Sequence, residues 1–442
     1  MFIPTKSGLK RNPSIRGNIN SEIVHLCASL ISFMVAPKKA AMGFIFVTLL
    51  IDVIGWGIII PVMPKLLEQM IHANISKAAS YQGWLLGTFA LAQFLFSPVL
   101  GNLSDRFGRR PIILISLFGF AIDYLFLAFA PNIGWFFVGR AIAGITGASF
   151  TTATAYIADI STNENRAKNF GMIGAAFGVG FMVGPMIGGL LGNLSPRVPF
   201  IAAAILCFLN WLWGFFILPE SLPVEKRRPF EWKRANPAGS LRHLRKHKGI
   251  SELVGSLTLI YIAAHAIQSN WSFFLTERFN WSPGLIGTSL GVVGLLVGLV
   301  QGGLTRIVNP RLGNERSVYV GLSLYSIGML LFAFATQSWM VFAFLVPYCL
   351  GGIAGPSLQA IISSHVPANE QGELQGALTS LMSATTIVGP LIMTNLFAYF
   401  TGPRAPVHYA GAPFILGALL LTASTFMAYH ALKTEKVHAA KV

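Results

Sequence analysis

Three charged side chains lie inside long apolar stretches of the sequence: Asp52, Asp123 and Arg140. A charge inside a bilayer is costly unless it is paired or hydrated, so such residues are functional candidates by default. A carboxyl group that exchanges protons needs a pKa raised toward neutrality by desolvation and adjusted by a nearby cation. The two acids and the arginine therefore predict a proton-coupling site. The alternative is a purely structural ion pair between Arg140 and one aspartate.

The second half of the chain has no acid in the middle of an apolar stretch, but it has a polar stripe. The stripe has helical spacing, falls on one face and comprises Tyr261, His265, Gln268 and Ser272. We expect Tyr261, His265 and Gln268 to bind substrate. Histidine titrates near neutrality, so His265 is also a proton-coupling candidate, with a hydrogen-bonded structural role as the alternative. Four further amide side chains lie in apolar stretches: Gln93, Gln301, Gln359 and Asn395. They are weaker candidates for a cavity wall, because amides also hydrogen-bond between packed helices.

The segment 101–110 has the pattern G-x-L-x-D-R-x-G-R-R between two apolar stretches. Glycines permit a tight turn between helices, an aspartate can cap a helix start, and arginines hold a loop at one membrane surface. A plain charged turn is the alternative interpretation. The functional interpretation assigns gating to Gly101, Asp105, Arg106, Gly108 and Arg109.

Small residues recur at close spacing around a Gly-Pro pair at 184–185. Such spacing lets helix backbones approach closely, and a proline bends a helix. The residues of this candidate antiporter motif are Gly180, Gly184, Pro185, Gly188 and Gly189. A matching small face is formed by Gly287, Gly291, Gly294 and Gly298. Ordinary tight packing is the alternative, and it is compatible with a function.

Composition indicates the solvent in which these residues lie. Of 442 residues, 54% are hydrophobic and only 11% are charged, with a mean hydropathy of +0.63. A soluble domain carries about a quarter charged residues, so most of this surface faces lipid. Three cysteines without C-x-x-C spacing exclude a disulfide scaffold and a cysteine-rich zinc site. The sequence lacks a phosphate-binding loop, a nucleophile elbow and a histidine-rich cluster, so we expect no enzyme.

Apolar runs near the length that crosses a bilayer, about 20 residues, occur twelve times. Continuous runs predict helices and not a β-barrel. We expect an all-α membrane protein with twelve transmembrane helices near 42–64, 81–100, 111–130, 135–157, 169–192, 199–218, 251–275, 284–305, 317–335, 339–360, 374–397 and 411–431. The predicted organisation is a disordered extension (1–41), a six-helix half (42–218), a basic cytoplasmic loop (219–250), a second six-helix half (251–432) and a cytoplasmic tail (433–442).

Basic residues predict the orientation, because Lys and Arg concentrate in cytoplasmic loops. With both termini inside, 26 of the 32 basic residues fall in inside segments, 5 fall outside, and Arg140 lies within a span. Topology thus accounts for most of the formal charge of +16. Nucleic-acid binding is not favoured, because the basic residues are spread over separate short loops. The basic cluster at 226–248 suits anionic lipid.

The two halves repeat one another in sequence. The fifth and eleventh spans match at an offset of 205, and the fourth and tenth at an offset of 204: Gly171/Gly376, Gly184-Pro185/Gly389-Pro390, Trp135/Trp339 and Gly147/Gly351. Two parallel six-helix halves are typical of a transporter that rocks about a site between them. We therefore expect two six-helix pseudo-repeats.

Residues 42–432 resemble the bacterial tetracycline–proton antiporters of the major facilitator superfamily. The stretches that carry the resemblance are Leu100–Pro111, Val138–Ala148, Ala155–Ile160, Gly178–Gly192, Gly372–Gly376 and Ile387–Leu391. The resemblance implies export of a tetracycline–divalent metal complex in exchange for protons. It implies that Asp105 and Arg109 latch the cytoplasmic gate and that the Gly-Pro bend prevents proton leak.

Carried over by position, the resemblance makes Asp52, Asp123 and Arg140 the membrane-embedded charges and Gln93 a substrate-linked glutamine. Two positions depart from the family pattern. The acid expected in the ninth span is Tyr325, and an arginine near the outer end of the first span is Glu68. Tyr325 and His265 are the candidates to replace the missing acid, and Tyr325 is accordingly a substrate-binding candidate.

The predicted function is proton-coupled export of drug-like compounds, tetracycline–metal complexes included, by alternating access. The alternatives are a transporter of the same superfamily for another drug, a sugar or a metabolite, a proton symporter among them, and a non-transporting membrane receptor on this fold. Expected partners are a small-molecule substrate, protons and the lipid bilayer, without nucleic acid. We expect a monomer in the inner membrane with both termini cytoplasmic. No cofactor is expected: the proton is the coupling ion, and Mg²⁺ travels only with the substrate.

Overall fold

The computed structural model describes residues 38–147, 149–162, 165–231, 251–366 and 371–439, and within these ranges the chain forms helices and turns but no strand. The predicted extension up to residue 37 and the loop segment 232–250 lie outside the described residues. The first helix begins at Lys38, earlier than the predicted start at 42. The last helix continues to Ala439, so the predicted tail begins as helix.

Helices of the first half follow the predicted spans closely. They are α2 (Lys38–Ile59), η1 (Ile60–Val62), α3 (Met63–Ile71), α4 (Ile75–Phe107), α5 (Arg109–Phe129), α6 (Ile133–Thr146), α7 (Ser149–Ile160), α8 (Arg166–Leu194) and α9 (Val198–Ile217). A short helix, η2 (Val224–Lys226), lies in the described part of the central loop.

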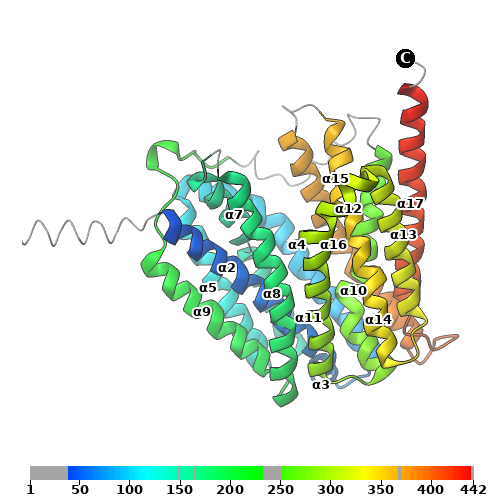
Figure 1. The fold of residues 1–442 in the computed structure, drawn as a ribbon. Coiled ribbons are helices and arrows are strands. Elements are labelled where there is room, and N and C mark those ends of the chain that lie inside the picture. The colour runs from blue at the N-terminus through cyan, green and yellow to red at the C-terminus, as the bar shows by residue number, and fades with distance from the viewer. Residues whose placement is uncertain (1–37, 148, 163–164, 232–250, 367–370, 440–442) are drawn as a thin grey trace, which may run out of the picture.

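The second half repeats this order (Figure 1). Its helices are α10 (Ser251–Phe279), α11 (Pro283–Leu299), η5 (Val300–Leu304), α12 (Thr305–Leu312), α13 (Asn314–Ala333), α14 (Ser338–Leu350), η6 (Gly351–Ile353), α15 (Ala354–Ser364), α16 (Gln371–Thr401) and α17 (Ala412–Ala439).

Eleven helical segments of the described chain are long and apolar enough to cross a membrane. The twelfth long helix is α10, whose 29 residues also exceed the length that crosses a bilayer, about 20 residues. Its buried face is unusually polar for a span and includes Ser256, His265, Ser269, Asn270 and Ser272. The all-α fold of twelve spans in two pseudo-repeats is therefore as predicted.

Four predicted spans are interrupted and not continuous. The first contains η1, a 3-10 turn, between α2 and α3. The fourth span breaks between α6 and α7, and the tenth breaks at η6, a single 3-10 turn. The eighth contains η5, a π-helical turn, between α11 and α12. Apolar length alone did not predict these breaks. The fourth and tenth spans break at Gly147 and Gly351, the pair related by the offset of 204.

Two helix pairs join the halves: α8 packs against α11, and α4 packs against α16 (Figure 1). Within the first half, α2 packs on α8 and α5 on α9. Within the second half, α10 and α13 both pack on α17. A site between the halves therefore lies between these two helix pairs.

The halves meet at one end of the bundle and separate toward the other. We name the ends by their turns: the basic end carries the turns at 107–109, 160–166 and 312–314, and the opposite end carries those at 72–74, 195–197 and 280–282. On one face of α4, Gly83 and Gly87 lie against α16 near the opposite end. Further toward the basic end on the same face, the position of a side chain at Gly101 meets no other described residue within 4 Å.

The second helix pair shows the same divergence. Gly189 of α8 lies against Gly287 of α11, and Met182 lies against Gly294. Closer to the basic end, the positions of a side chain at Gly178 and Gly298 meet no other described residue within 4 Å. The structure is thus closed at the opposite end and open at the basic end.

Candidate transport site

Asp123 of α5 and Arg140 of α6 form an ion pair inside the first half. Asp123 is fully buried, Arg140 is 8% exposed, and its guanidinium lies 5.7 Å from the centroid of the Phe89 ring. A buried charge without a partner is strongly destabilising, so each residue of the pair lowers the free-energy cost of burying the other. The sequence offered two aspartates as partners of Arg140, and the fold selects Asp123.

Asp52 of α2 lies outside this pair. Both of its carboxyl oxygens are enclosed and have no hydrogen-bond partner among the described residues. α7 packs against α2, the helix that carries Asp52. Tyr124, which follows Asp123 in the chain, points its hydroxyl at Gly55 of α2, three residues beyond Asp52. The site therefore has one balanced ion pair and one acid without a cation beside it in the described chain.

A cavity of about 40 Å³ lies between the halves beside Arg140. This volume has room for a few water molecules. The polar side chains in its wall come from both halves and are Gln82, Arg140, Gln268, Ser269 and Ser272. The Oε1 atom of Gln82 is buried without a hydrogen-bond partner in the described chain. Gln82 was missed by the sequence reasoning, although a glutamine in an apolar run is the signal that singled out Gln93.

The polar stripe of α10 is divided by the fold. Gln268 and Ser272 lie in the cavity wall, and Ser272 also donates a hydrogen bond to the Ile60 carbonyl of the first half (2.9 Å). His265 is buried and packs against Gly389 of α16, where an added methyl group would collide with its ring. Tyr261 packs its half-buried ring against the core. The stripe thus serves both the cavity and helix packing.

Two further substrate-binding candidates contact helix breaks. Tyr325 packs against Gly351 at the break of the tenth span, with its ring centroid 5.1 Å from that of Tyr348. Gln93 donates a hydrogen bond from Nε2 to the Gly147 carbonyl at the break of the fourth span (3.0 Å). Tyr325 and Gln93 therefore each contact the helix break of their own half.

The other three amide candidates are placed differently from Gln93. Asn395 of α16 accepts a hydrogen bond from the Ser80 hydroxyl of α4 (2.8 Å), so it joins the halves near the opposite end. Gln359 donates to Gln375 within the second half (3.2 Å). Gln301 is exposed in η5.

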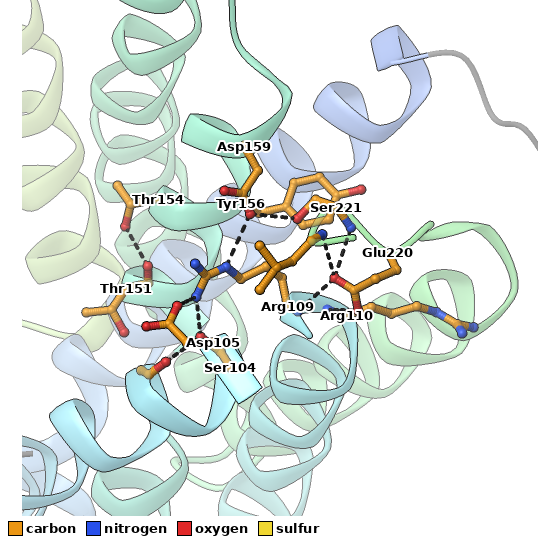
Figure 2. Close-up of polar contacts among 12 residues, drawn as sticks. Ser104, Asp105, Arg109, Arg110, Thr151, Thr154, Tyr156, Asp159, Glu220 and Ser221 are labelled. Carbon is orange, nitrogen blue, oxygen red and sulfur yellow. Dashed lines mark hydrogen bonds and ion pairs between the residues drawn. The ribbon is translucent and has the colours of Figure 1, made fainter. Parts of the chain in front are cut away.

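The loop motif at the basic end forms a charge network within the first half (Figure 2). Arg109 pairs with Asp105 at 2.6 Å and with Asp159 of α7 at 3.2 Å. It also donates to the Ser104 hydroxyl (2.6 Å), and Asp159 accepts a hydrogen bond from Ser221 (3.0 Å). Arg109 therefore ties α4, α7 and the end of the sixth span together.

Glu220 completes this network and was not predicted. Its two carboxylate oxygens accept hydrogen bonds from the backbone N–H groups of Arg109 (2.8 Å) and Arg110 (3.2 Å) at the start of α5. A carboxylate at a helix N-terminus is stabilised by the free N–H groups there. Gly108, just before this helix, has φ +107° and offers no side chain for capping, so Glu220 supplies the cap. The sequence holds no local signal for a cap from residue 220.

The other two gating candidates lie outside the network. Arg106 is exposed, with its guanidinium 5.0 Å from the centroid of the Phe107 ring. Gly101 of α4 has open space where a side chain would begin. The described contacts of the motif are thus concentrated on Asp105, Gly108 and Arg109.

The antiporter-motif residues form two close helix contacts. Gly180, Gly184 and Gly188 lie against α2, and Pro185 lies against Gly57 of that helix. Gly189 lies against the backbone of Pro283, Gly284 and Gly287 at the start of α11. α8 therefore sits between α2 and α11, which it can approach closely because its side chains are small there. Pro185 lies inside α8.

Apolar spans that enclose an ion pair, a separate acid and a polar cavity between two repeated halves define a multi-pass membrane transporter. The sequence model of the Major Facilitator Superfamily matches residues 45–390 and, in a second match, 307–441. The class C tetracycline resistance protein of Escherichia coli is 42% identical over 380 residues, 86% of this chain and 94% of that protein. The class G protein of Vibrio anguillarum is 37% identical, over 84% of this chain and 92% of that protein.

Solved structures show the same fold. The human organic anion transporter MFSD10 (TETRAN) has a TM-score of 0.64 at 25% identity and covers 89% of this chain and 99% of its own. A bacterial homolog of the human lysosomal transporter Spinster, in an inward-facing and occupied conformation, has a TM-score of 0.70 at 16% identity, over 90% of this chain and 97% of its own. This chain belongs to the Major Facilitator Superfamily and, within it, to the family of the tetracycline resistance proteins. It is a transporter of small molecules and not an enzyme.

Proposed function

We propose that this chain exports amphipathic drug-like compounds across the inner membrane in exchange for protons. The observation that carries the proposal is Asp52, an enclosed carboxyl group without a cation beside it in the described chain, near the balanced pair of Asp123 and Arg140. An unpaired carboxylate is costly within a bilayer, and binding a proton removes its charge. Proton binding at Asp52 therefore changes which conformation of the protein is favoured.

The coupling follows from two ligands that bias one equilibrium. The basic end is cytoplasmic in the proposed topology, so the conformation that is open there receives substrate from the cytoplasm. Substrate binding favours the change that opens the opposite end, where the substrate leaves. Protons bound there favour the return and leave on the cytoplasmic side. Asp123 and Arg140 take part by adjusting the charge near Asp52 in each conformation.

Substrate recognition falls to the polar groups of both halves. Gln82, Gln268 and Arg140 offer hydrogen-bonding groups in a mainly apolar wall, which suits a compound with an apolar body and a polar edge. The names of the tetracycline resistance relatives make tetracycline with Mg²⁺ the first substrate to test. Tyr325 stands where an acid was expected, so the proposal covers drug-like compounds beyond tetracycline. Mg²⁺ enters as part of the substrate, and the unit of transport is the monomer with both termini cytoplasmic.

Everted membrane vesicles with an imposed pH gradient test this function. Tetracycline with Mg²⁺ is the first probe, followed by a panel of amphipathic drugs, and each is scored by uptake and by proton release from the vesicle. Wild-type protein is expected to take up a probe and to dissipate the gradient. Asp52→Asn is expected to insert normally and to lose gradient-driven uptake, while Glu225→Gln, at an exposed acid of η2, serves as the control.

Undiminished gradient-driven uptake by Asp52→Asn contradicts proton coupling at this residue. Uptake of other drugs without tetracycline supports the broader proposal and removes tetracycline from it. Transport that is indifferent to the pH gradient for every compound of the panel contradicts proton exchange altogether.

A further inference from the structure

The fourth span is built as two helices with different attachments. α6 ends at Thr146 and carries Arg140, whereas α7 begins at Ser149 and carries Asp159. The break between them therefore separates the ion pair of the membrane interior from the charge network of the basic end. Gly147 terminates α6 with φ −70° and ψ 32°, outside the regular helical conformation.

Gln93 of α4 is joined to this break. A carbonyl at a helix end lacks its partner within the helix, and the Gly147 carbonyl receives a hydrogen bond from Gln93 Nε2 at 3.0 Å. The side chain therefore satisfies a group that the break has left free. This contact uses one of the two N–H donors of the Gln93 amide and attaches the side chain to the scaffold in this conformation.

Close packing fixes α6 on the near side of the break. A methyl group at Gly144 would lie 2.6 Å from the Ala92 side chain and 3.1 Å from the Gln93 backbone nitrogen. A methyl group at Gly147 would lie 2.8 Å from the Ala143 carbonyl and 3.1 Å from Gln93 Nε2. α6 and α4 thus form one unit up to Gly147, and α7 begins beyond it.

Asp52 belongs to a helix that contacts the far side of the same break. α7, which begins at Ser149, packs against α2, the helix that carries Asp52. A rearrangement of α2 when Asp52 changes its charge therefore reaches α7. Arg109 holds the other end of α7 through Asp159.

The second half contains a counterpart of this arrangement. Its fourth helix breaks at Gly351, and Gln301 lies 3.8 Å from the position of a methyl group at the adjacent Gly352. Gln301 follows Gln93 by 208 residues, close to the offset of 204 that relates Gly351 to Gly147. The counterpart is one of position: Gln301 is exposed and approaches its break through Cγ, and the hydrogen bond to a break carbonyl is described for Gln93.

We propose that Gln93 is a positioning residue that holds the break at Gly147, and that α7 swings about this break when the basic end closes. The hydrogen bond to Gly147 belongs to the conformation that is open at the basic end. The inference rests on the proposed function only in requiring that this end opens and closes, and the identity of the substrate does not enter.

Thiol labelling measures the opening without any substrate. The reporter is Gly298→Cys, on the α11 face that carries Gly287 and Gly294, where the position of a side chain is open near the basic end. It is modified in everted vesicles by a membrane-impermeant maleimide. Gln93→Met keeps the length of the side chain and removes the donor, and it is expected to slow labelling about three- to tenfold, since a hydrogen bond of ordinary strength is lost from the open form. Gln69→Met, at an exposed glutamine of α3, is the control and is expected to label at the original rate.

Two further measurements separate a hinge from a substrate contact. Gly147→Ala disturbs the same break from the other side and is expected to change labelling too, with the double variant no different from the stronger single one. Binding of tetracycline with Mg²⁺ is measured on the same variants. A normal labelling rate in both Gln93→Met and Gly147→Ala overturns the proposal, and weakened probe binding with normal labelling assigns Gln93 to the substrate. The labelling result holds even if wild-type protein does not bind the probe, which would count against the proposed substrate alone.

Discussion

Neutralising one member of the Asp123–Arg140 pair is expected to be far more harmful than neutralising both. Asp123→Asn leaves Arg140, 8% exposed, without its carboxylate in the described surroundings. Loss of one partner of a buried pair destabilises a protein by about 3–5 kcal/mol, whereas removal of both charges is often close to neutral. The double variant Asp123→Asn/Arg140→Gln should therefore regain about 2 kcal/mol or more of the loss summed over its two single variants.

Unfolding in detergent by increasing sodium dodecyl sulfate, followed through the fluorescence of the nine tryptophans, measures these free energies. Asp52→Asn is the matched control, because neutralising Asp52 leaves no described cation unpaired, and we expect its stability to change by less than about 1 kcal/mol. A double variant as unstable as the sum of the two single variants would refute the reasoning, since the two charges would then be independent.

Three further predictions concern glycines and a cap. Gly189→Ala places a methyl group against the backbone of α11 and should destabilise the closed opposite end by about 1–3 kcal/mol. Thiol labelling from that side of the membrane should show this as slower closure, whereas Gly178→Ala, in open space, should match wild type. Gly108→Ala puts a side chain at φ +107° and against Glu220, so we expect a loss of about 1–3 kcal/mol in the same unfolding assay, with Gly101→Ala unchanged. Glu220→Gln weakens the charge at the start of α5 and should cost about 1 kcal/mol, and an unchanged midpoint would contradict the capping role.

Most of the architecture was predictable from the sequence because the bilayer constrains it strongly. Every backbone polar group within lipid must be satisfied by its own segment, so long apolar runs become helices. α10 illustrates the strength of this rule: its polar residues reduce its apolar character, yet its length and position in the repeat still predicted a span. The breaks at Gly147 and Gly351 were not predicted, because apolar length is insensitive to one irregular turn, although Pro347, inside α14 just before Gly351, was a signal for the second.

Candidate residues were likewise found more easily than their partners. Charges and amides in apolar runs were visible in the sequence, and Asp123, Arg140 and Gln268 do lie together at or near the cavity. Gln93 has a backbone partner at a helix break, and Tyr325 packs against one, which their residue types did not reveal.

By itself, therefore, the sequence determined which segments cross the membrane, that they form two repeated halves, and which side chains are too costly there to be incidental. Only the tertiary structure decided which aspartate neutralises Arg140, that Asp159 and Glu220 join Arg109, and that the basic end stands open. The physical reason is range: helix formation depends on neighbours within a few residues, whereas these pairings span as many as 111 residues and depend on how each helix is rotated and tilted against the others.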